Sequence, residues 1–152
     1  MMLKALQNRL NQDIPLTKHM GIEIRSYDGE TLSLQAPLDR NINHKQTAFG
    51  GSLYSISVLT GWSLIYLILQ ESGLEGHIVI QKTQTRFLLP VSTDLMTECR
   101  ITDPQDKTRF LKTYRRKGLA RLHLEVSIGA DNGKTQLCFE GDYVVHKHPL
   151  PS

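Results

Sequence analysis

The chain has 152 residues, with 18 Lys and Arg against 15 Asp and Glu, so its formal net charge at pH 7 is +3. Hydrophobic residues make up 39% of the chain and charged residues 22%, which is the composition of an ordinary globular protein and excludes a disordered chain, a collagen and a disulfide scaffold. A chain of this length can bury roughly 68–70% of the surface that it exposes when unfolded. We therefore expect one domain that spans residues 1–152.

The N-terminal part of the chain predicts a helix followed by two paired strands. Leucines recur at helical spacing between residues 3 and 10, and Pro15 ends that helix. Apolar residues then alternate with polar ones on both sides of an Asp-Gly turn at 28–29. This alternation predicts two antiparallel strands, over 20–27 and 30–38.

The middle of the chain predicts a long buried helix. A polar and irregular segment, 39–49, leads to Gly50-Gly51 and then to a helix that we expect over 52–70. This helix is apolar around almost its whole circumference, so we expect other protein to enclose it. Its serine, threonine and glycine residues keep it short of a clean membrane span of roughly 20 apolar residues. We therefore expect no membrane partner.

The second half of the chain predicts four more strands and one helix. The strands are expected over 77–88, 94–101, 119–130 and 134–146. An Asn-Gly turn at 132–133 joins the last two strands as a hairpin. A helix is expected over 103–118, because Asp103 suits its N-cap, Pro104 its first turn and Gly118 its end.

This order of elements predicts an α+β fold, in which a curved antiparallel sheet of about six strands wraps around the long apolar helix. Such an open sheet leaves its two edge strands unpaired, and pairing between two copies of the chain would cover one of them. We therefore expect a homodimer, or a higher homo-oligomer built from it.

Seven basic side chains and no acidic one lie between Lys107 and Arg121. The plain interpretation is a solvated helix whose last turn carries cations that complement the helix dipole. The alternative is a landing site for an acidic partner. Phe110 and Tyr114 lie four residues apart within this run, which is typical of the packed side of a helix, so we expect no nucleic-acid partner.

The remaining sequence features concern the compartment and cofactors. Cys99 and Cys138 are the only cysteines and form no CxxC pair, and the N-terminal segment has no apolar signal region. Together these features predict reduced thiols and a cytoplasmic location. The histidines form no recognisable metal set and the chain has no GxxxxGK motif, so we expect no metal and no cofactor.

One segment resembles a known family. Residues 43–55, NHKQTAFGGSLYS, resemble the N-x-x-Q-T-x-x-G-G segment that opens the central helix in hotdog-fold thioesterases of the phenylacetate-pathway type. A closer resemblance, over essentially the whole chain, is to the YiiD C-terminal family of the thioesterase superfamily. It is carried in this order by 14–16 (IPL), 36–38 (APL), 41–44 (NINH) and 47–54 (TAFGGSLY).

The resemblance implies the hotdog fold and action on acyl thioesters of acyl carrier protein or CoA. The family also looks to include decarboxylases of malonyl groups that are carried on acyl carrier protein. Acyl carrier proteins are acidic and CoA carries phosphates, so the basic run becomes a candidate docking face. Its candidate residues are Lys112, Arg115, Arg116 and Arg121.

The residues before the central helix suit an oxyanion hole. Gly50 and Gly51 allow a ligand to approach the backbone, and a helix N-terminus presents unpaired N–H groups and a partial positive charge. Asn43, Gln46 and Thr47 add neutral donors beside that terminus. The alternatives are that the glycines only allow tight packing and that the polar residues only cap the loop.

We assign three residues as catalytic candidates: Asn43, Thr47 and Gly51. The substrate-binding candidates surround them and are His44, Gln46, Phe49, Gly50, Ser52 and Tyr54. His44 would donate a proton to the enolate carbon or bind a malonyl carboxylate; the plain interpretation is that it hydrogen-bonds its neighbours.

The segment departs from the thioesterase pattern at two positions. Val58 stands where the phenylacetate-type enzymes carry a carboxylate on the central helix, and Phe49 stands where a histidine often precedes the two glycines. No Asp or Glu occurs between residues 40 and 70. Hydrolysis benefits from a base that activates water, and here that base would have to come from the sheet or from a partner subunit.

Three residues of the sheet region are possible bases: Asp94, Glu98 and Glu125. Decarboxylation of a malonyl thioester needs no base, because the departing CO2 leaves its electron pair behind and neutral donors stabilise the enolate. The sequence therefore favours malonyl decarboxylation on acyl carrier protein. The alternatives are an acyl thioester hydrolase and a non-catalytic acyl-binding dimer.

Overall fold

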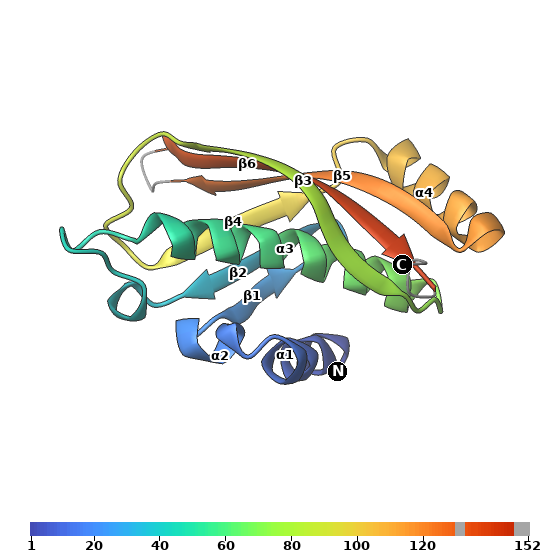
Figure 1. The fold of residues 1–152 in the computed structure, drawn as a ribbon, viewed down its shortest axis with the longest axis horizontal. Coiled ribbons are helices and arrows are strands. Elements are labelled where there is room, and N and C mark those ends of the chain that lie inside the picture. Colours follow the sequence, from blue (N-terminus) through green and yellow to red (C-terminus); the bar gives the residue numbers. More distant parts are fainter. Residues whose placement is uncertain (130–132, 148–152) are drawn as a thin grey trace.

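A curved antiparallel sheet wraps around one long helix in the computed structural model, which describes residues 1–129 and 133–147 (Figure 1). The helices are α1 (Met2–Asp13), α2 (Leu16–Met20), the 3₁₀ turn η1 (Leu38–Arg40), α3 (Gly50–Glu71) and α4 (Pro104–Lys117). The strands are β1 (Glu23–Tyr27), β2 (Thr31–Ala36), β3 (His77–Phe87), β4 (Leu95–Arg100), β5 (Leu119–Gly129) and β6 (Thr135–His146). Their order in the sheet is β1-β2-β4-β5-β6-β3, so β1 and β3 form its edges.

Alternation along the strands separates a core face from an outer face. In β5 every second residue from Ala120 to Ile128 is buried, whereas Arg121, His123 and Glu125 between them are exposed. β5 pairs with β6 along most of its length, as the hairpin prediction requires. Of the expected turn, Gly133 is described and has a φ of 81°, whereas Asn132 lies outside the described residues.

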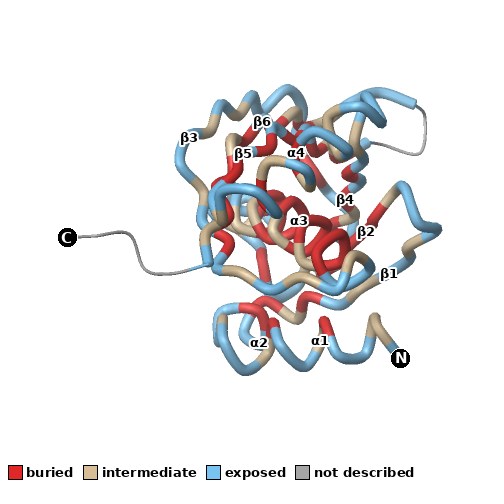
Figure 2. Tube along the Cα trace, turned by 90° about the vertical axis from the view of Figure 1, so that its right-hand side faces the viewer, coloured by how far each residue is buried: buried red, intermediate tan, exposed pale blue. Residues whose placement is uncertain are grey.

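The central helix α3 fills the hollow of the sheet. Twelve of its 22 residues are buried, and Figure 2 shows the buried parts of the chain gathered at and around α3. Gly61 allows the closest approach, since a Cβ there would lie 2.3 Å from the Tyr143 hydroxyl oxygen. That hydroxyl donates to the Val58 carbonyl oxygen at 2.7 Å, and burial raises the pKa of Tyr143, so it remains a donor.

The chain leaves one stripe of α3 partly uncovered. Tyr54 is exposed, and Val58, Trp62 and Tyr66 follow it at spacings of four residues as half-buried side chains. The helix is long and apolar enough to cross a membrane, but 67% of its most apolar window is buried inside the protein. The helix is therefore the core helix of this fold, with one stripe only partly covered.

The N-terminal elements differ from the sequence prediction at one point. Met20 was expected to begin a strand, but it ends the short helix α2, and β1 begins only at Glu23. Gly21 causes the change of direction: its φ of 72° is left-handed, and its N–H donates to the Lys18 carbonyl oxygen. α1 then packs against the core through Leu6 and Leu10.

The helix α4 closes the end of the fold at which α3 finishes. The Asp103 side chain accepts the Gln105 N–H at 2.9 Å and caps the helix start, as predicted. Phe110 and Tyr114 are buried, and the Tyr114 hydroxyl donates to the Glu75 carbonyl oxygen just beyond α3. In Figure 1, α4 and the first turn of α3 accordingly lie at opposite ends of the molecule.

Candidate functional site

A buried asparagine fixes the loop that leads into α3. The Asn41 side chain is 2% exposed and donates to the carbonyl oxygens of Met20 at 2.9 Å and Pro37 at 2.7 Å. Its backbone carbonyl accepts the Phe49 N–H at 2.7 Å. Asn41 therefore ties the residue before the helix to α2 and to the end of β2.

Asn43 and Thr47 brace the same loop from within. The Asn43 Oδ1 accepts the N–H groups of Lys45 at 2.8 Å and Thr47 at 3.2 Å, and the Asn43 Nδ2 donates to the Thr47 Oγ1 at 2.9 Å. The other contact of Nδ2, with the Ala48 carbonyl oxygen, is long at 3.5 Å. The structure thus brings two predicted catalytic residues together and leaves one N–H of the Asn43 amide weakly engaged.

The two glycines begin α3 with free backbone donors. Phe49 precedes them in an extended conformation, with φ −65° and ψ 133°, and its carbonyl oxygen accepts the N–H groups of Ser52 and Leu53. Among the described residues, the N–H groups of Gly50 and Gly51 have no acceptor. The start of a helix carries a partial positive charge, so these two N–H groups are suited to donate to a partly negative oxygen.

Two exposed aromatic rings border these donors. The Phe49 ring folds over Gly51, where a Cβ would lie 2.4 Å from the ring, and the Phe87 ring lies 3.6 Å from the position of a Cβ on Gly50. Phe49 is 55% exposed and Phe87 56%. The glycine pair therefore presents polar N–H groups inside an apolar rim, where the electrostatic interaction with a ligand is stronger than in bulk water.

The other predicted substrate-binding residues are spread around this rim. His44 and Gln46 are exposed, and Ser52 is half-buried in the first turn of α3. Tyr54 is one turn further along, with its hydroxyl 3.0 Å from the Thr83 Oγ1 on the edge strand β3. Gln46 has a φ of 65°, which is unusual for a residue other than glycine. It lines an open hollow shared with Asp39 and Asp94, and its place beside the glycine donors stays a prediction.

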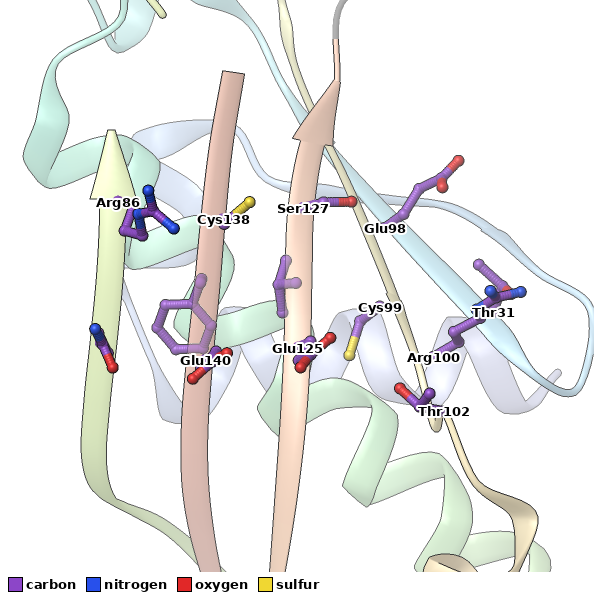
Figure 3. A pocket seen from close by; sticks show the side chains of 13 residues that line it. Thr31, Arg86, Glu98, Cys99, Arg100, Thr102, Glu125, Ser127, Cys138 and Glu140 are labelled. Carbon is purple, nitrogen blue, oxygen red and sulfur yellow. The ribbon is translucent and has the colours of Figure 1, made fainter. Parts of the chain in front are cut away.

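Two of the possible bases lie on the wrong face of the sheet. Figure 3 shows Glu98 and Glu125 on the outer face, where they line a hollow of about 660 Å³, while α3 lies behind the strands. Asp94 lies closer to the loop, but its Oδ1 accepts the Leu38 N–H at 2.9 Å. Val58, which the sequence resemblance aligns with a carboxylate of the phenylacetate-type enzymes, is half-buried. The sheet thus separates Glu98 and Glu125 from the glycine donors.

The outer face also carries a group of ligand-type side chains. Single ligand atoms of His123, Glu125 and Glu140 lie within 4.8 Å of one another, and the His123 Nδ1 is 2.6 Å from an Asp142 carboxylate oxygen. All three are exposed. Cys99, which points into the core beneath this face, has a pKa raised to about 12 by burial and by the charge of Glu125. These groups form no part of the site at the start of α3.

The candidate docking residues lie at the other end of the fold. Lys112, Arg115 and Arg116 are exposed on α4, spaced so that they share the helix face opposite Phe110 and Tyr114. Arg121 lies at the start of β5, and its Nε donates to the Gln81 side-chain oxygen at 3.2 Å. The structure therefore places Lys112, Arg115 and Arg116 on one face of α4, at the end of the fold opposite the glycine pair (Figure 1).

Comparisons with known proteins identify the family and agree with the fold. A family model described as "Putative thioesterase (yiiD_Cterm)" matches residues 3–147. A solved protein of unknown function from Chlorobaculum tepidum TLS is 37% identical, with a TM-score of 0.91, over 95% of this chain and 94% of the other. A protein from Shewanella oneidensis described as a "putative thioesterase" is 33% identical, with a TM-score of 0.86, over 95% and 97%.

A more distant structure shares the fold alone. The PaaI protein of E. coli, from the phenylacetic acid degradation operon, is 16% identical, with a TM-score of 0.66, over 97% of this chain and 94% of the other. These similarities confirm the hotdog fold and the family resemblance that the sequence predicts.

Sequence reasoning missed two residues that shape this site. Phe87 lies 37 residues beyond Gly50, and only the fold brings its ring against the helix start. Asn41 stands in the NINH phrase, but nothing in that phrase distinguishes a buried asparagine from an exposed one. One sequence signal could have indicated Phe87. It belongs to an apolar run, Phe87-Leu88-Leu89, at the end of a strand, and all three side chains are exposed.

We predict that Asn41→Ala lowers the free energy of unfolding by about 1–3 kcal/mol, because the buried carbonyl oxygen of Met20 and the partly buried one of Pro37 lose their donor. Urea unfolding of the purified protein measures the change. Asn8→Ala, at an exposed position of α1, is the matched control and should change little. Equal stability of the two variants would contradict the role given to Asn41.

Proposed function

Because the chain belongs to the YiiD C-terminal family of the thioesterase superfamily, we propose that it decarboxylates malonyl groups carried on acyl carrier protein, and that it produces the acetyl thioester and CO2. The observation that carries this proposal is the pair of unengaged N–H groups at Gly50 and Gly51, at the start of a helix, with no Asp or Glu between residues 41 and 70. These donors would bind the thioester oxygen, on which negative charge develops.

In this reaction, negative charge develops on the oxygen atom of the thioester carbonyl. The bond between the malonyl carboxyl carbon and the α-carbon breaks, and its electron pair moves toward the thioester carbonyl to form an enolate. CO2 leaves, and the α-carbon then takes a proton, from water or from His44, to complete the acetyl group. The protein has to stabilise the enolate oxygen, for which two N–H groups at a helix start are suited.

The surroundings of the donors favour loss of a carboxylate. The rings of Phe49 and Phe87 make the rim apolar, so the malonyl carboxylate would lose part of its hydration on binding and leave more readily as neutral CO2. A protein carboxylate at this point would repel the substrate. Val58 in place of an acid removes that repulsion.

Hydrolysis of acyl thioesters is the second candidate function. It is favoured by one observation, the presence of Asp94 in the hollow that Gln46 also lines. A water molecule held between these two side chains would need Asp94 as its base. The Leu38 N–H occupies one oxygen of that carboxylate and leaves the other for this role.

We also propose that two copies of the chain pair through the edge strand β3. Exposed large apolar side chains gather along this edge and near the helix start: Phe49, Tyr54, Val79, Phe87, Leu88 and Leu89. The chain pairs only one side of β3, with β6, and the partly uncovered stripe of α3 is a second surface for a neighbour. Antiparallel pairing of two β3 strands would cover the unpaired edge and shield the apolar residues.

We expect malonyl acyl carrier protein, incubated with the purified protein, to lose the mass of CO2 and to become the acetyl form. Mass spectrometry of the intact carrier measures the product. Release of free thiol without an acetyl form would replace decarboxylation with hydrolysis. No change with malonyl, acetyl or longer acyl carriers, or with the corresponding CoA esters, would contradict both activities.

Gly50→Pro removes one proposed donor without removing any hydrogen bond within the protein, and we expect it to lower kcat about 10²–10³-fold. Proline is tolerated at the first helical position, and the extended Phe49 has the conformation favoured before proline. Gly50→Ala keeps the N–H and places a Cβ 3.6 Å from Phe87, an ordinary contact, so it should stay within a few-fold of the parent. Equal activity of the two variants would exclude the Gly50 N–H as a donor.

Asn43→Ala should lower kcat by roughly 10²–10³ if the Asn43 amide also donates to the substrate oxygen. Asn43→Asp is the second variant: it retains the acceptor for the N–H groups of Lys45 and Thr47 but loses the donor, and its negative charge would also repel a malonyl carboxylate. We expect both variants to be impaired alike. Activity retained in the aspartate variant alone would reduce Asn43 to a brace of the loop, and activity retained in both would remove it from the site.

A further inference from the structure

The basic face of α4 and the glycine donors lie at opposite ends of one chain. The loop just beyond α3 contacts α4 through the Tyr114 hydroxyl and the Glu75 carbonyl oxygen, whereas Gly50 begins α3. A helix of 22 residues is about 33 Å long, and β3, which runs back along it, has a similar length. A partner bound to α4 would therefore have to extend a substrate along the whole of α3 to reach the donors of the same chain.

If two β3 strands paired, the α4 face of one chain would lie near the glycine donors of the other chain. The start of β3, at His77, adjoins the α4 end of the fold, because the neighbouring Gly76 lies against the Tyr114 hydroxyl. The end of β3, at Phe87, lies against Gly50. In an antiparallel pair centred on β3, the start of one strand lies beside the end of the other. The α4 helix of each chain would then lie at the same end of the dimer as the glycine donors of its partner.

The chemistry of the α4 face suits an acidic macromolecule. Lys112, Arg115 and Arg116 share the helix face opposite the packed residues, and no acidic residue occurs between Lys107 and Arg121. None of the three has an ion-pair partner among residues 1–129 and 133–147. Such a face attracts an acidic protein over a distance and orients it, with an effect that falls as salt rises.

We propose that the α4 face of each chain docks the acidic carrier protein that delivers its acyl thioester to the glycine donors of the partner chain. This inference rests on the proposed function and adds that one subunit binds the carrier protein while the other supplies the oxyanion donors. Each active unit then consists of Lys112, Arg115 and Arg116 from one chain and Gly50 and Gly51 from the other.

Mixed dimers test the assignment. Two chains with different affinity tags are co-expressed, and only dimers that carry both tags are collected. The site variant is Gly50→Pro and the docking variant is Arg115→Glu with Arg116→Glu; Lys4→Glu with Arg25→Glu, on exposed positions of α1 and β1, is the matched charge control. The homodimer of the docking variant should lose about tenfold in kcat/KM for malonyl carrier protein at low salt.

Docking across the dimer makes opposite predictions from docking within one chain. A dimer of one site variant and one docking variant should keep about half of the parent activity, because the intact site faces an intact α4 of its partner. A dimer of one parent chain and one chain with all three substitutions should keep only about a twentieth of the parent activity, because its one intact site faces a substituted α4 and the docking substitutions cost about tenfold. Docking within one chain predicts the reverse: half of the parent activity for the dimer of a parent chain with the triply substituted chain, and much less for the dimer of the site variant with the docking variant. That result would overturn the proposal, and so would a parent protein that sediments as a monomer.

A readout without turnover separates this proposal from the proposed function. A carrier protein whose arm ends in a photoreactive diazirine acyl group is irradiated with the mixed dimer of one parent chain and one docking variant. Docking across the dimer should direct labelling of the peptide around Phe49 to the docking variant, whose partner has the intact α4. Labelling of the parent chain instead would contradict the proposal, even if the protein showed no decarboxylase activity.

Because Glu at the end of a helix opposes the helix dipole, the docking variant could also weaken α4. Arg115→Gln with Arg116→Gln is the second variant, since it removes the charges without reversing them. Thermal unfolding should remain close to that of the parent for this pair, while kcat/KM falls and its dependence on salt becomes shallower. If the salt dependence of kcat/KM did not change, Arg115 and Arg116 would be solvated residues at a helix end with no part in docking.

Discussion

The structure depends on the burial of one helix. α3 is too apolar to be exposed to water, and the sheet and α1 are arranged so that twelve of its 22 residues are shielded. The packing is close enough to require glycine at position 61, where Tyr143 occupies the space of a side chain. Because the interior of the helix is held so tightly, its position along the sheet is fixed, and so is the place at which its first turn emerges.

The free donors follow from this constraint. A helix start always has N–H groups without intrahelical partners, and most proteins engage them with a capping side chain. Here the nearby polar side chains are used elsewhere: Asn41 holds α2 and the end of β2, and Asn43 closes its own loop. The residue at the cap position is Phe49, which has no side-chain acceptor. The glycine N–H groups are therefore held in place by the loop and left unengaged, which is the preorganisation that stabilisation of a developing oxyanion requires.

Sequence periodicity predicted most of the fold, because the core is built from regular alternation and one continuous apolar helix. The strands and the two long helices were expected within a few residues of their observed ends, and the glycine pair was placed at the start of α3. The short helix α2 was missed, since five residues are too few to show a period and Met20 fits a strand equally well. Contacts between segments far apart in the sequence could not be predicted from periodicity either. The ring of Phe87 against Gly50 and the burial of Asn41 arise only when the sheet closes on the helix.

The packing of the sheet around α3 also determines which charged residues lie near the start of the helix. Along the sequence, Glu98 and Glu125 are as available as any other acid, but the sheet places them on its outer face and α3 on its inner one. The basic run is displaced in another way, to the far end of the helix whose start carries the donors. Both ends are connected by one edge strand, β3, which begins near α4 and finishes at Phe87 beside Gly50. An edge strand that pairs with its own copy in the antiparallel sense joins unlike ends, so the proposed docking face of one chain would lie beside the proposed donors of its partner.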